Sequence, residues 1–147
     1  MVVMHRRYLL RSLLGCLVAT VGGCGGNAKM AAVTGTVTFK GQPLANAQVN
    51  FAPVAGGPIA TGQTDASGKF QLGTNSINDG ALVGKHKVGV IARGPNRPLR
   101  PGEVGSGMPG DTTPGDPLIP AKFFDPQTSG LEREVVRGSN DFQLQLE

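Results

Sequence analysis

A serine, a histidine and an aspartate that could form a hydrolytic triad occur at Ser67, His86 and Asp65. In such a triad the histidine takes the proton of the serine hydroxyl and the carboxylate orients the imidazole. Asp65 and Ser67, however, lie in the stretch 64–69, whose composition is typical of a hairpin turn. No nucleophile elbow surrounds Ser67, and His86 has the spacing of an inward-facing strand residue. We expect His86 to be buried and hydrogen-bonded, and we expect no catalytic residues. The sequence therefore predicts that the chain is not an enzyme.

Cys24 carries a different chemistry, because its thiol can be joined to a lipid. It follows a basic start at residues 5–11 and an apolar stretch at 12–21, which is too short for a spanning helix of about 20 residues and is typical of a signal peptide. Val21-Gly22-Gly23-Cys24 resembles the lipobox of bacterial lipoproteins. The resemblance implies cleavage between Gly23 and Cys24 and a diacylglyceryl thioether on Cys24. The alternative is a soluble secreted protein in which Cys24 is an ordinary residue near the cleavage site.

These features predict a signal peptide at 1–23, a flexible tether at 24–31 and a folded domain at 32–147. We expect the domain to be anchored by lipid in a bacterial cell envelope, facing the periplasm or the surface. Gly25, in place of Asp after the cysteine, resembles the outer-membrane sorting signal of diderm bacteria and favours the outer over the inner membrane. Arg6-Arg7-Tyr8-Leu9-Leu10-Arg11 resembles the twin-arginine export pattern; a generic basic leader is the alternative.

The excess of basic over acidic residues lies mainly in the predicted signal peptide. The formal net charge is +4, but without Arg6, Arg7 and Arg11 the chain has 11 basic and 10 acidic residues. A near-neutral domain gives no electrostatic reason to bind a nucleic acid. We therefore expect no nucleic-acid partner.

Metal ligands are scarce in the predicted domain. Cys16 leaves with the leader, Cys24 would be acylated, and His86 is the one remaining histidine. A zinc site needs three or four convergent ligands, and Asp65 and Asp79 lack the regular spacing of a calcium loop. We expect no metal and no cofactor.

Residue spacing from position 33 onward predicts an all-β domain. Val33, Gly35, Val37 and Phe39 alternate with polar residues, which is the period of a half-buried strand. Such patterns predict about seven short strands, at 33–40, 47–52, 60–64, 69–72, 85–90, 131–135 and 142–146. The 23 glycines, 11 prolines and absence of tryptophan favour one small two-sheet sandwich. The predicted core comprises Val33, Val37, Phe39, Val49, Phe51, Phe70, Leu72, Val88, Val90, Leu131, Val135, Phe142 and Leu144.

Four stretches resemble the carboxypeptidase regulatory-like domain. They are 33–44 (VTGTVTFKGQPL), 47–51 (AQVNF), 64–70 (TDASGKF) and 84–90 (GKHKVGV). Residues 120–131 and the closing strand are similar to the tail of small bacterial lipoproteins that carry this domain. The resemblance implies a seven-stranded transthyretin-like (prealbumin-like, Ig-like) β-sandwich with an accessory or adhesion-like, non-catalytic role and no particular ligand. His86 stands where these domains often have tyrosine.

The stretch Arg137-Gly138-Ser139 can be compared with a motif of enzymes that share this fold. Transthyretin-like hydrolases of purine degradation end in a Tyr-Arg-Gly-Ser motif, supported by several histidines. Here Val136 replaces the tyrosine, eight residues follow Ser139, and the histidines are missing. We expect a polar turn at this position.

Residues 93–117 form a predicted insertion that is rich in glycine and proline. Its few apolar side chains cannot offset the entropy of ordering, so we expect a mobile spacer between two strands. Arg93, Arg97 and Arg100 lie in its first half. They are candidate ligands for an anionic surface polymer or phosphate group.

These expectations converge on a lipid-anchored envelope protein that displays a non-catalytic β-sandwich as a binding or structural module. Its expected partners are the membrane, through the anchor, and an envelope protein or polysaccharide. Two alternatives stay open. One is an accessory subunit of an envelope hydrolase, and the other is a soluble secreted or periplasmic binding domain.

Overall fold

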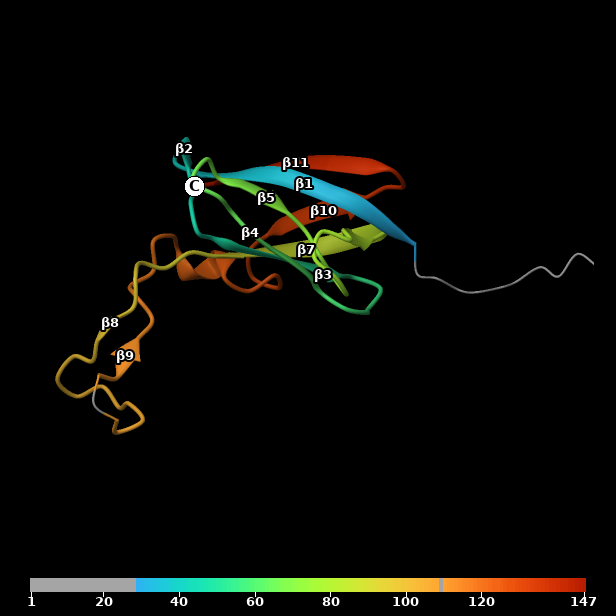
Figure 1. Ribbon diagram of the computed structural model, residues 1–147. Coiled ribbons are helices and arrows are strands. Elements are labelled where there is room, and N and C mark those ends of the chain that lie inside the picture. Colours follow the sequence, from blue (N-terminus) through green and yellow to red (C-terminus); the bar gives the residue numbers. More distant parts are fainter. Residues whose placement is uncertain (1–28, 109) are drawn as a thin grey trace, which may run out of the picture.

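Short strands joined by turns make up the folded part of the chain (Figure 1). The computed structural model describes residues 29–108 and 110–147, so Gly23, Cys24 and the predicted signal peptide lie outside the described residues. None of the helices in those ranges is long and apolar enough to cross a membrane. The elements are β1 (Met30–Phe39), β2 (Gln42–Pro43), β3 (Gln48–Pro53), β4 (Ala60–Gln63), β5 (Lys69–Gln71), β6 (Ala81–Leu82), β7 (Gly84–Ile91), β8 (Arg97–Pro98), β9 (Thr112–Thr113), the 3-10 helix η1 (Ala121–Phe123), β10 (Leu131–Val135) and β11 (Ser139–Leu146).

The first sheet is organised around β1. One edge of β1 pairs in parallel with β11, from Ala32 opposite Ser139 to Phe39 opposite Leu146. Its other neighbours, β6, β5 and β2, pair with it antiparallel in that order along its length. Because β1 serves all four partners, it is the strand on which this sheet depends.

The second sheet is antiparallel and has the order β10-β7-β3-β4. β3 and β4 form a hairpin, and the opposite edge of β3 pairs with β7. β7 is buried at His86 and at the consecutive residues Val88, Gly89 and Val90, because the first sheet covers one of its faces and the segment around η1 packs on the other. Gly89 permits this cover, since a Cβ there would come within 2.8 Å of the Pro126 ring.

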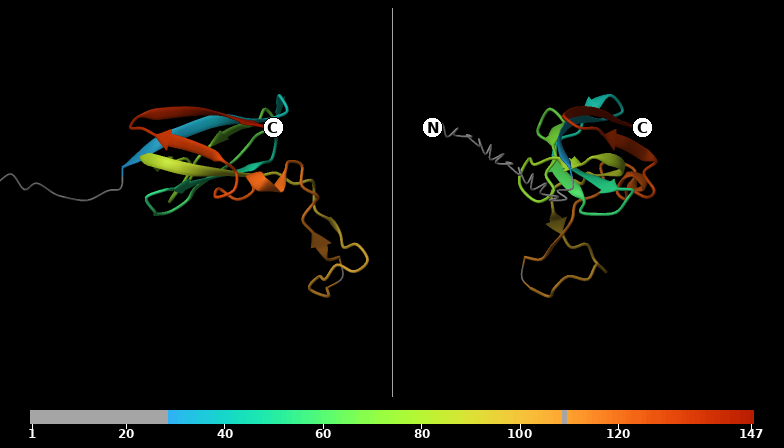
Figure 2. Two further views of the ribbon diagram at one scale, coloured as in Figure 1. Left: turned by 180° about the vertical axis from the view of Figure 1, so that it is seen from behind. Right: turned by 90° about the vertical axis from the view of Figure 1, so that its right-hand side faces the viewer.

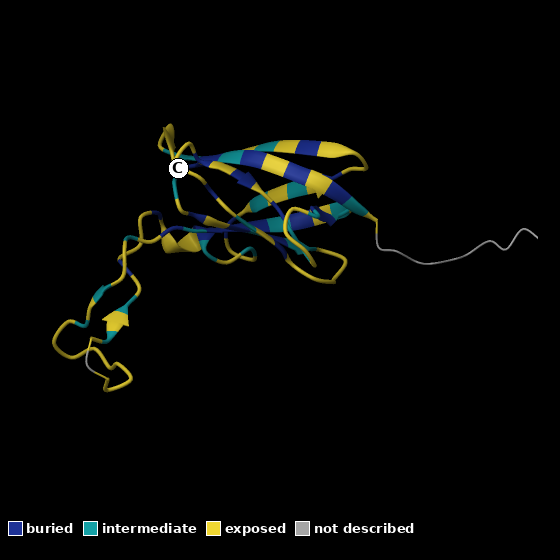
Figure 3. Cartoon of the chain, in the orientation of Figure 1, coloured by how far each residue is buried: buried dark blue, intermediate teal, exposed yellow. Residues whose placement is uncertain are grey.

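The two sheets lie face to face as two layers with the core between them (Figure 2). Buried and exposed residues alternate along β1 and β11 (Figure 3), as strands covered on one face require. In the core, the fully buried Phe51 ring lies 6.3 Å from the Phe70 ring and stacks on the partly buried Phe142 ring with centroids 5.8 Å apart. Burial of such side chains contributes roughly 1.5–3 kcal/mol each.

One side of the sandwich is closed by backbone hydrogen bonds between the two sheets. The N–H of Thr61 donates to the carbonyl of Gly73, and the N–H of Gly73 donates to the carbonyl of Thr61, both over 2.8 Å. Gly62 allows this approach, because a Cβ there would collide with the carbonyl oxygen of Gln71. We call this junction of β4 with the end of β5 the seam.

Thr64 ties the chain together at the end of β4. Its buried hydroxyl donates to the carbonyl of Leu44 over 2.6 Å and accepts from the N–H of Ala47 over 2.8 Å. The residue therefore holds the β2–β3 connection against the seam, with its own polar atom fully satisfied.

The predicted hairpin turn after Thr64 is confirmed. The Asp65 carboxylate accepts from the N–H groups of Ser67 and Lys69 and from the Ser67 hydroxyl, over 2.7–3.0 Å. These bonds hold the pKa of Asp65 below its usual value. Gly68 takes the left-handed conformation, with φ +77°, which glycine adopts without steric cost.

The all-β class is confirmed, and each of the seven predicted segments is a strand, but the strand count is corrected. The described residues hold eleven strands, the additional ones being the two-residue strands β2, β6, β8 and β9. The domain boundary also moves, because β1 begins at Met30 and pairs with β6 while Ala31 is buried. The predicted tether at 24–31 is therefore too long by two residues.

The predicted core is correct at its centre and wrong at its rim. Phe39, Leu131 and Phe142 are only partly buried and pack on the outside of the cluster. The sequence pattern missed buried residues that lie outside alternating runs or have small side chains, namely Ala31, Leu44, Ala47, Ala60, Ala81, Ala92, Ile119 and Phe123. It also left out Leu146, the last residue of the alternating run at 142–146.

Gly35 offers a test of this packing, because it faces the core between its partners Phe70 and Phe142. A Cβ there would lie 2.6 Å from the Phe70 ring and would meet the carbonyl of Phe142. We expect Gly35→Ala to lower the free energy of unfolding by ~1–3 kcal/mol, measured by urea denaturation. Gly94→Ala is the control, because its Cβ would have 3.8 Å of clearance. Equal stability of the two variants would contradict the packing.

Candidate functional site

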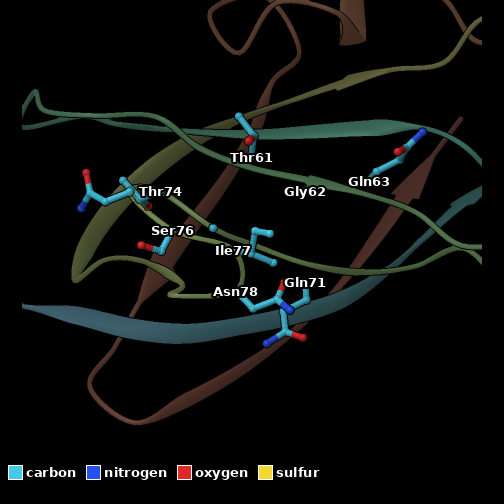
Figure 4. Close-up of a pocket in the computed structure, with 10 residues that line it drawn as sticks. Thr61, Gly62, Gln63, Gln71, Thr74, Ser76, Ile77 and Asn78 are labelled. Atoms are coloured by element: carbon cyan, nitrogen blue, oxygen red, sulfur yellow. The ribbon is translucent and has the colours of Figure 1, made fainter.

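A polar hollow of about 700 Å³ lies against the seam, and we call it the seam hollow. This volume is in the range of small-molecule sites, about 300–1,000 Å³. Thr61, Gly62 and Gln63 of β4 line it together with Gln71 and the loop 73–78. In the view of Figure 4, the Ile77 side chain lies between Gly62 and the pair Gln71 and Asn78.

The hollow exists because its floor is backbone. Gly62 and Gly73 carry no side chain there, and a Cβ on Gly73 would run into the backbone of Ser76 and Asn78. Thr61 and Gly73 already exchange their backbone hydrogen bonds, so these two residues of the floor are closed to further pairing. Recognition in this hollow therefore depends on the side chains around it.

Asp79 positions one rim of the seam hollow. Its carboxylate accepts from the N–H groups of Thr74, Asn75 and Ser76 over 2.6–3.0 Å. The bond from Thr74 is the largest cause of a pKa below the usual aspartate value. Asp79 therefore caps the loop and holds the backbone of residues 74–76, from which side chains of the rim project.

The rim itself is uncharged and rich in amides. Within the part of the chain that the structure describes, the side chains of Gln63, Gln71 and Asn78 form no hydrogen bond with another residue, and all three are exposed. Each amide offers two donor hydrogens and one acceptor oxygen. Ile77 adds an apolar surface with 92% of its area exposed.

The seam hollow continues into two neighbouring hollows. One, of about 440 Å³, shares Thr61, Gly62 and Gln63 and runs toward Arg93. The other, of about 590 Å³, shares Gln63 and Gln71 and crosses the outer face of the first sheet. Gln63 borders all three, so the surface is an open polar groove rather than a closed pocket.

The structure does not assemble the triad drawn from the sequence. His86 is buried in the core, 5.9 Å from the Phe51 ring, with its Nδ1 3.0 Å from the carbonyl of Gly84. Its Nε2 is buried without a hydrogen-bond partner. Asp65 and Ser67 are exposed and bond to each other in the turn. The predicted burial of His86 is therefore confirmed.

Residues 93–117 leave the sandwich as an arm (Figure 1), with internal structure that the sequence did not predict. β8 and β9 pair within it, and Arg93 and Pro117 form a bridge at its base. The Arg97 guanidinium donates two bonds to the Glu103 carboxylate, over 2.8 and 2.9 Å. The expectation that the arm makes few ordered contacts is corrected, because charged pairs rather than apolar burial connect its two halves; its mobility stays a prediction.

The three arginines proposed as ligands for an anion make contacts within the chain. Arg100 bonds to Asp116 over 2.8 Å, and Arg97 lies 3.6 Å from the same carboxylate. Arg93 lies over the Phe124 ring and donates to the carbonyl of Gly115 over 3.4 Å. These contacts argue against Arg97 and Arg100 as an anion site, because acidic side chains already neutralise both charges.

Metal ligands do not converge within residues 29–108 and 110–147, where no group of three or more His, Cys, Asp or Glu side chains comes together. The carboxylates of Asp65, Asp79 and Asp111 each accept backbone N–H bonds in their own loops instead.

Comparisons with protein-family models, curated proteins and solved structures give no match for this chain. The family resemblance therefore rests on the residue motifs given above.

The sequence did not predict the seam hollow. The one signal in the sequence was the run of small polar residues at 74–76, which has the composition of an ordinary loop.

Burial of His86 predicts a pH dependence of stability. Burial lowers the pKa of His86 below 6.5, so the unfolded chain binds a proton first as the pH falls. The stability contributed by the neutral imidazole is thus present above the unfolded pKa and is lost below it. We expect urea stability to drop between about pH 7.5 and about pH 5.5, and the drop to shrink in His86→Leu. An unchanged pH dependence in that variant would show that burial of His86 does not cause the drop in stability.

The Arg97–Glu103 pair predicts a local effect in the arm. The bond from Arg97 lowers the pKa of Glu103 from 4.5 to about 2, so the pair's contribution is fully present above about pH 4.5 and is lost progressively as the pH falls from there to about 2. We expect Glu103→Gln to speed amide hydrogen exchange around Arg97 and Thr113 while the exchange of β7 stays unchanged. Glu132→Gln on β10 is the control. Equal exchange in both variants would show that the pair does not hold the arm.

Proposed function

We propose that this chain is a lipid-anchored cell-envelope protein whose β-sandwich is a non-catalytic binding module displayed from a membrane. The observation that carries the proposal is the position of the two ends of the sandwich. The chain enters β1 at one end, and the arm projects from the opposite end (Figures 1 and 2). An anchor upstream of β1 would hold the entry end toward the membrane and turn the arm away from it.

The length of the connection supports this arrangement. Residues 25–29 separate Cys24 from the start of β1, and this segment spans at most about 18 Å when fully extended. Acyl chains on Cys24 would contribute about 0.8 kcal/mol per buried methylene, and more than one chain gives stable anchoring. The sandwich would then stand close to the bilayer while its far end meets partners in the envelope.

A transthyretin-like fold of the carboxypeptidase regulatory-like type is part of the proposal. Its support is the two-layered all-β architecture together with the motifs at 33–44 and 64–70, which form β1 with its following turn and the Asp65 turn. Modules of this type imply a role in adhesion or in support of another protein. The proposal assigns no reaction to the chain itself.

An accessory subunit of an envelope hydrolase is the second candidate. The arm favours it, because Val104 and Met108 expose 95% and 71% of their areas on a segment held by its own ion pairs. Exposed apolar side chains on a projecting element suit contact with a protein partner. In that case the active residues would belong to the partner.

The anchor is tested by the intact mass of the full chain expressed in a bacterial host and extracted from its membranes. We expect the mass of residues 24–147 plus diacylglyceryl and acyl groups, and recovery in the membrane fraction. Cys24→Ala should release the chain from the membrane, while Cys16→Ala, the matched control within the leader, should leave the lipidated mass unchanged. A bare mature mass in the soluble fraction would contradict the proposal.

A further inference from the structure

We infer that the seam hollow binds a neutral oligosaccharide segment of an envelope polysaccharide. The inference rests on the proposed function and deepens it, because it names the ligand class of the displayed module. It depends on four features of the hollow: its side-chain chemistry, its closed backbone floor, its open shape and its apolar residue.

The side chains around the hollow match the hydrogen bonding of a sugar. Hydroxyl groups of Thr61 and Ser76 and amides of Gln63, Gln71 and Asn78 both donate and accept. Sugar hydroxyls also do both, so each ligand group finds a partner without a change of protonation. No residue that lines the seam hollow itself is charged, so a phosphate or carboxylate placed there would find no cation to offset its desolvation. The charged side chains of the groove, Arg93, Asp65, Lys69 and Asp141, line the two neighbouring hollows and are of both signs.

The paired backbone of Thr61 and Gly73 in the floor favours a sugar over a peptide strand as the ligand. A peptide that extends a sheet needs free backbone N–H and C=O groups along the edge. At the seam, Thr61 and Gly73 already bond to each other in both directions, and β3 occupies the other edge of β4. A ligand here therefore meets side chains, which favours a polyol over an extended peptide.

The shape of the groove suits a polymer rather than a single small molecule. The seam hollow continues on both sides into the two hollows that share Gln63, so a chain could pass through without ending there. Ile77 stands exposed at the rim and offers an apolar contact for the C–H face of a sugar ring.

Binding at one such site is weak, because water competes for the rim amides and no aromatic ring lines the hollow. Many copies anchored in one membrane compensate for weak single sites, since a polymer that spans several copies gains avidity. The affinity of a single copy should therefore rise only modestly with oligosaccharide length, whereas membrane-bound copies should retain the polymer strongly.

The test is a calorimetric titration of the full membrane-extracted chain in detergent. The probes are short neutral oligosaccharides of the gluco, manno, galacto and N-acetylglucosamine series, with polygalacturonate oligosaccharides as the charged counterpart and an uncharged Gly/Ser/Asn peptide as the second comparison. We expect binding to at least one neutral series. The double variant Gln63→Ala/Gln71→Ala should weaken it by about tenfold or more.

Gln145→Ala is the matched control, because Gln145 is an exposed amide on β11 outside the seam hollow. Unchanged urea stability of all variants shows that they fold. No binding to any neutral series, tighter binding of the charged oligosaccharide or the peptide, or equal loss in the Gln145→Ala control would overturn the inference. The same titration is run on the chain recovered from the soluble fraction if its mass is bare, so failure of binding is distinct from failure of the anchor, which the mass of the same sample reports.

Discussion

The approach of β4 to the end of β5 is the constraint on which the rest of the structure depends. Two backbone hydrogen bonds between Thr61 and Gly73 join β4 of the second sheet to the end of β5 of the first sheet. They form only because Gly62 presents no Cβ to the carbonyl of Gln71. The same missing side chains leave a floor of paired backbone, and the loop capped by Asp79 raises a polar rim beside it. The backbone pair that closes the sandwich thus also lines the seam hollow.

Much of the fold could be predicted from the sequence because its strands and turns depend on residues that are near one another in the chain. The alternation along β1 and the Asp65–Gly68 turn depend on neighbours in the chain, and both were predicted correctly. The structure also placed residues that no local pattern marks. Ile119 and Phe123 are buried by the return of the chain across β7, and short strands such as β6 exist only because β1 is there to pair with them.

The candidate sites were harder to predict, since each depends on contacts between distant residues. The spacing of Arg97 and Arg100 suggested free cations, but Asp116, which the fold brings back from across the arm, pairs with both. Conversely, Gln63 and Gln71 lie in ordinary strand sequence, and only the seam brings them to one groove. The chain enters the sandwich at one end and the arm leaves it at the other (Figure 1), and the polar groove lies at the junction of β4 with the end of β5.

The most direct test of this account is amide hydrogen exchange of the lipidated chain, read residue by residue, with and without a neutral oligosaccharide that it binds. The account predicts that the Thr61 and Gly73 amides are protected before the ligand is added, because the seam is closed. It also predicts that ligand-induced changes concentrate at 61–63 and 71–78 and spare the arm. Fast exchange at Thr61 and Gly73, or changes confined to 93–117, would contradict it.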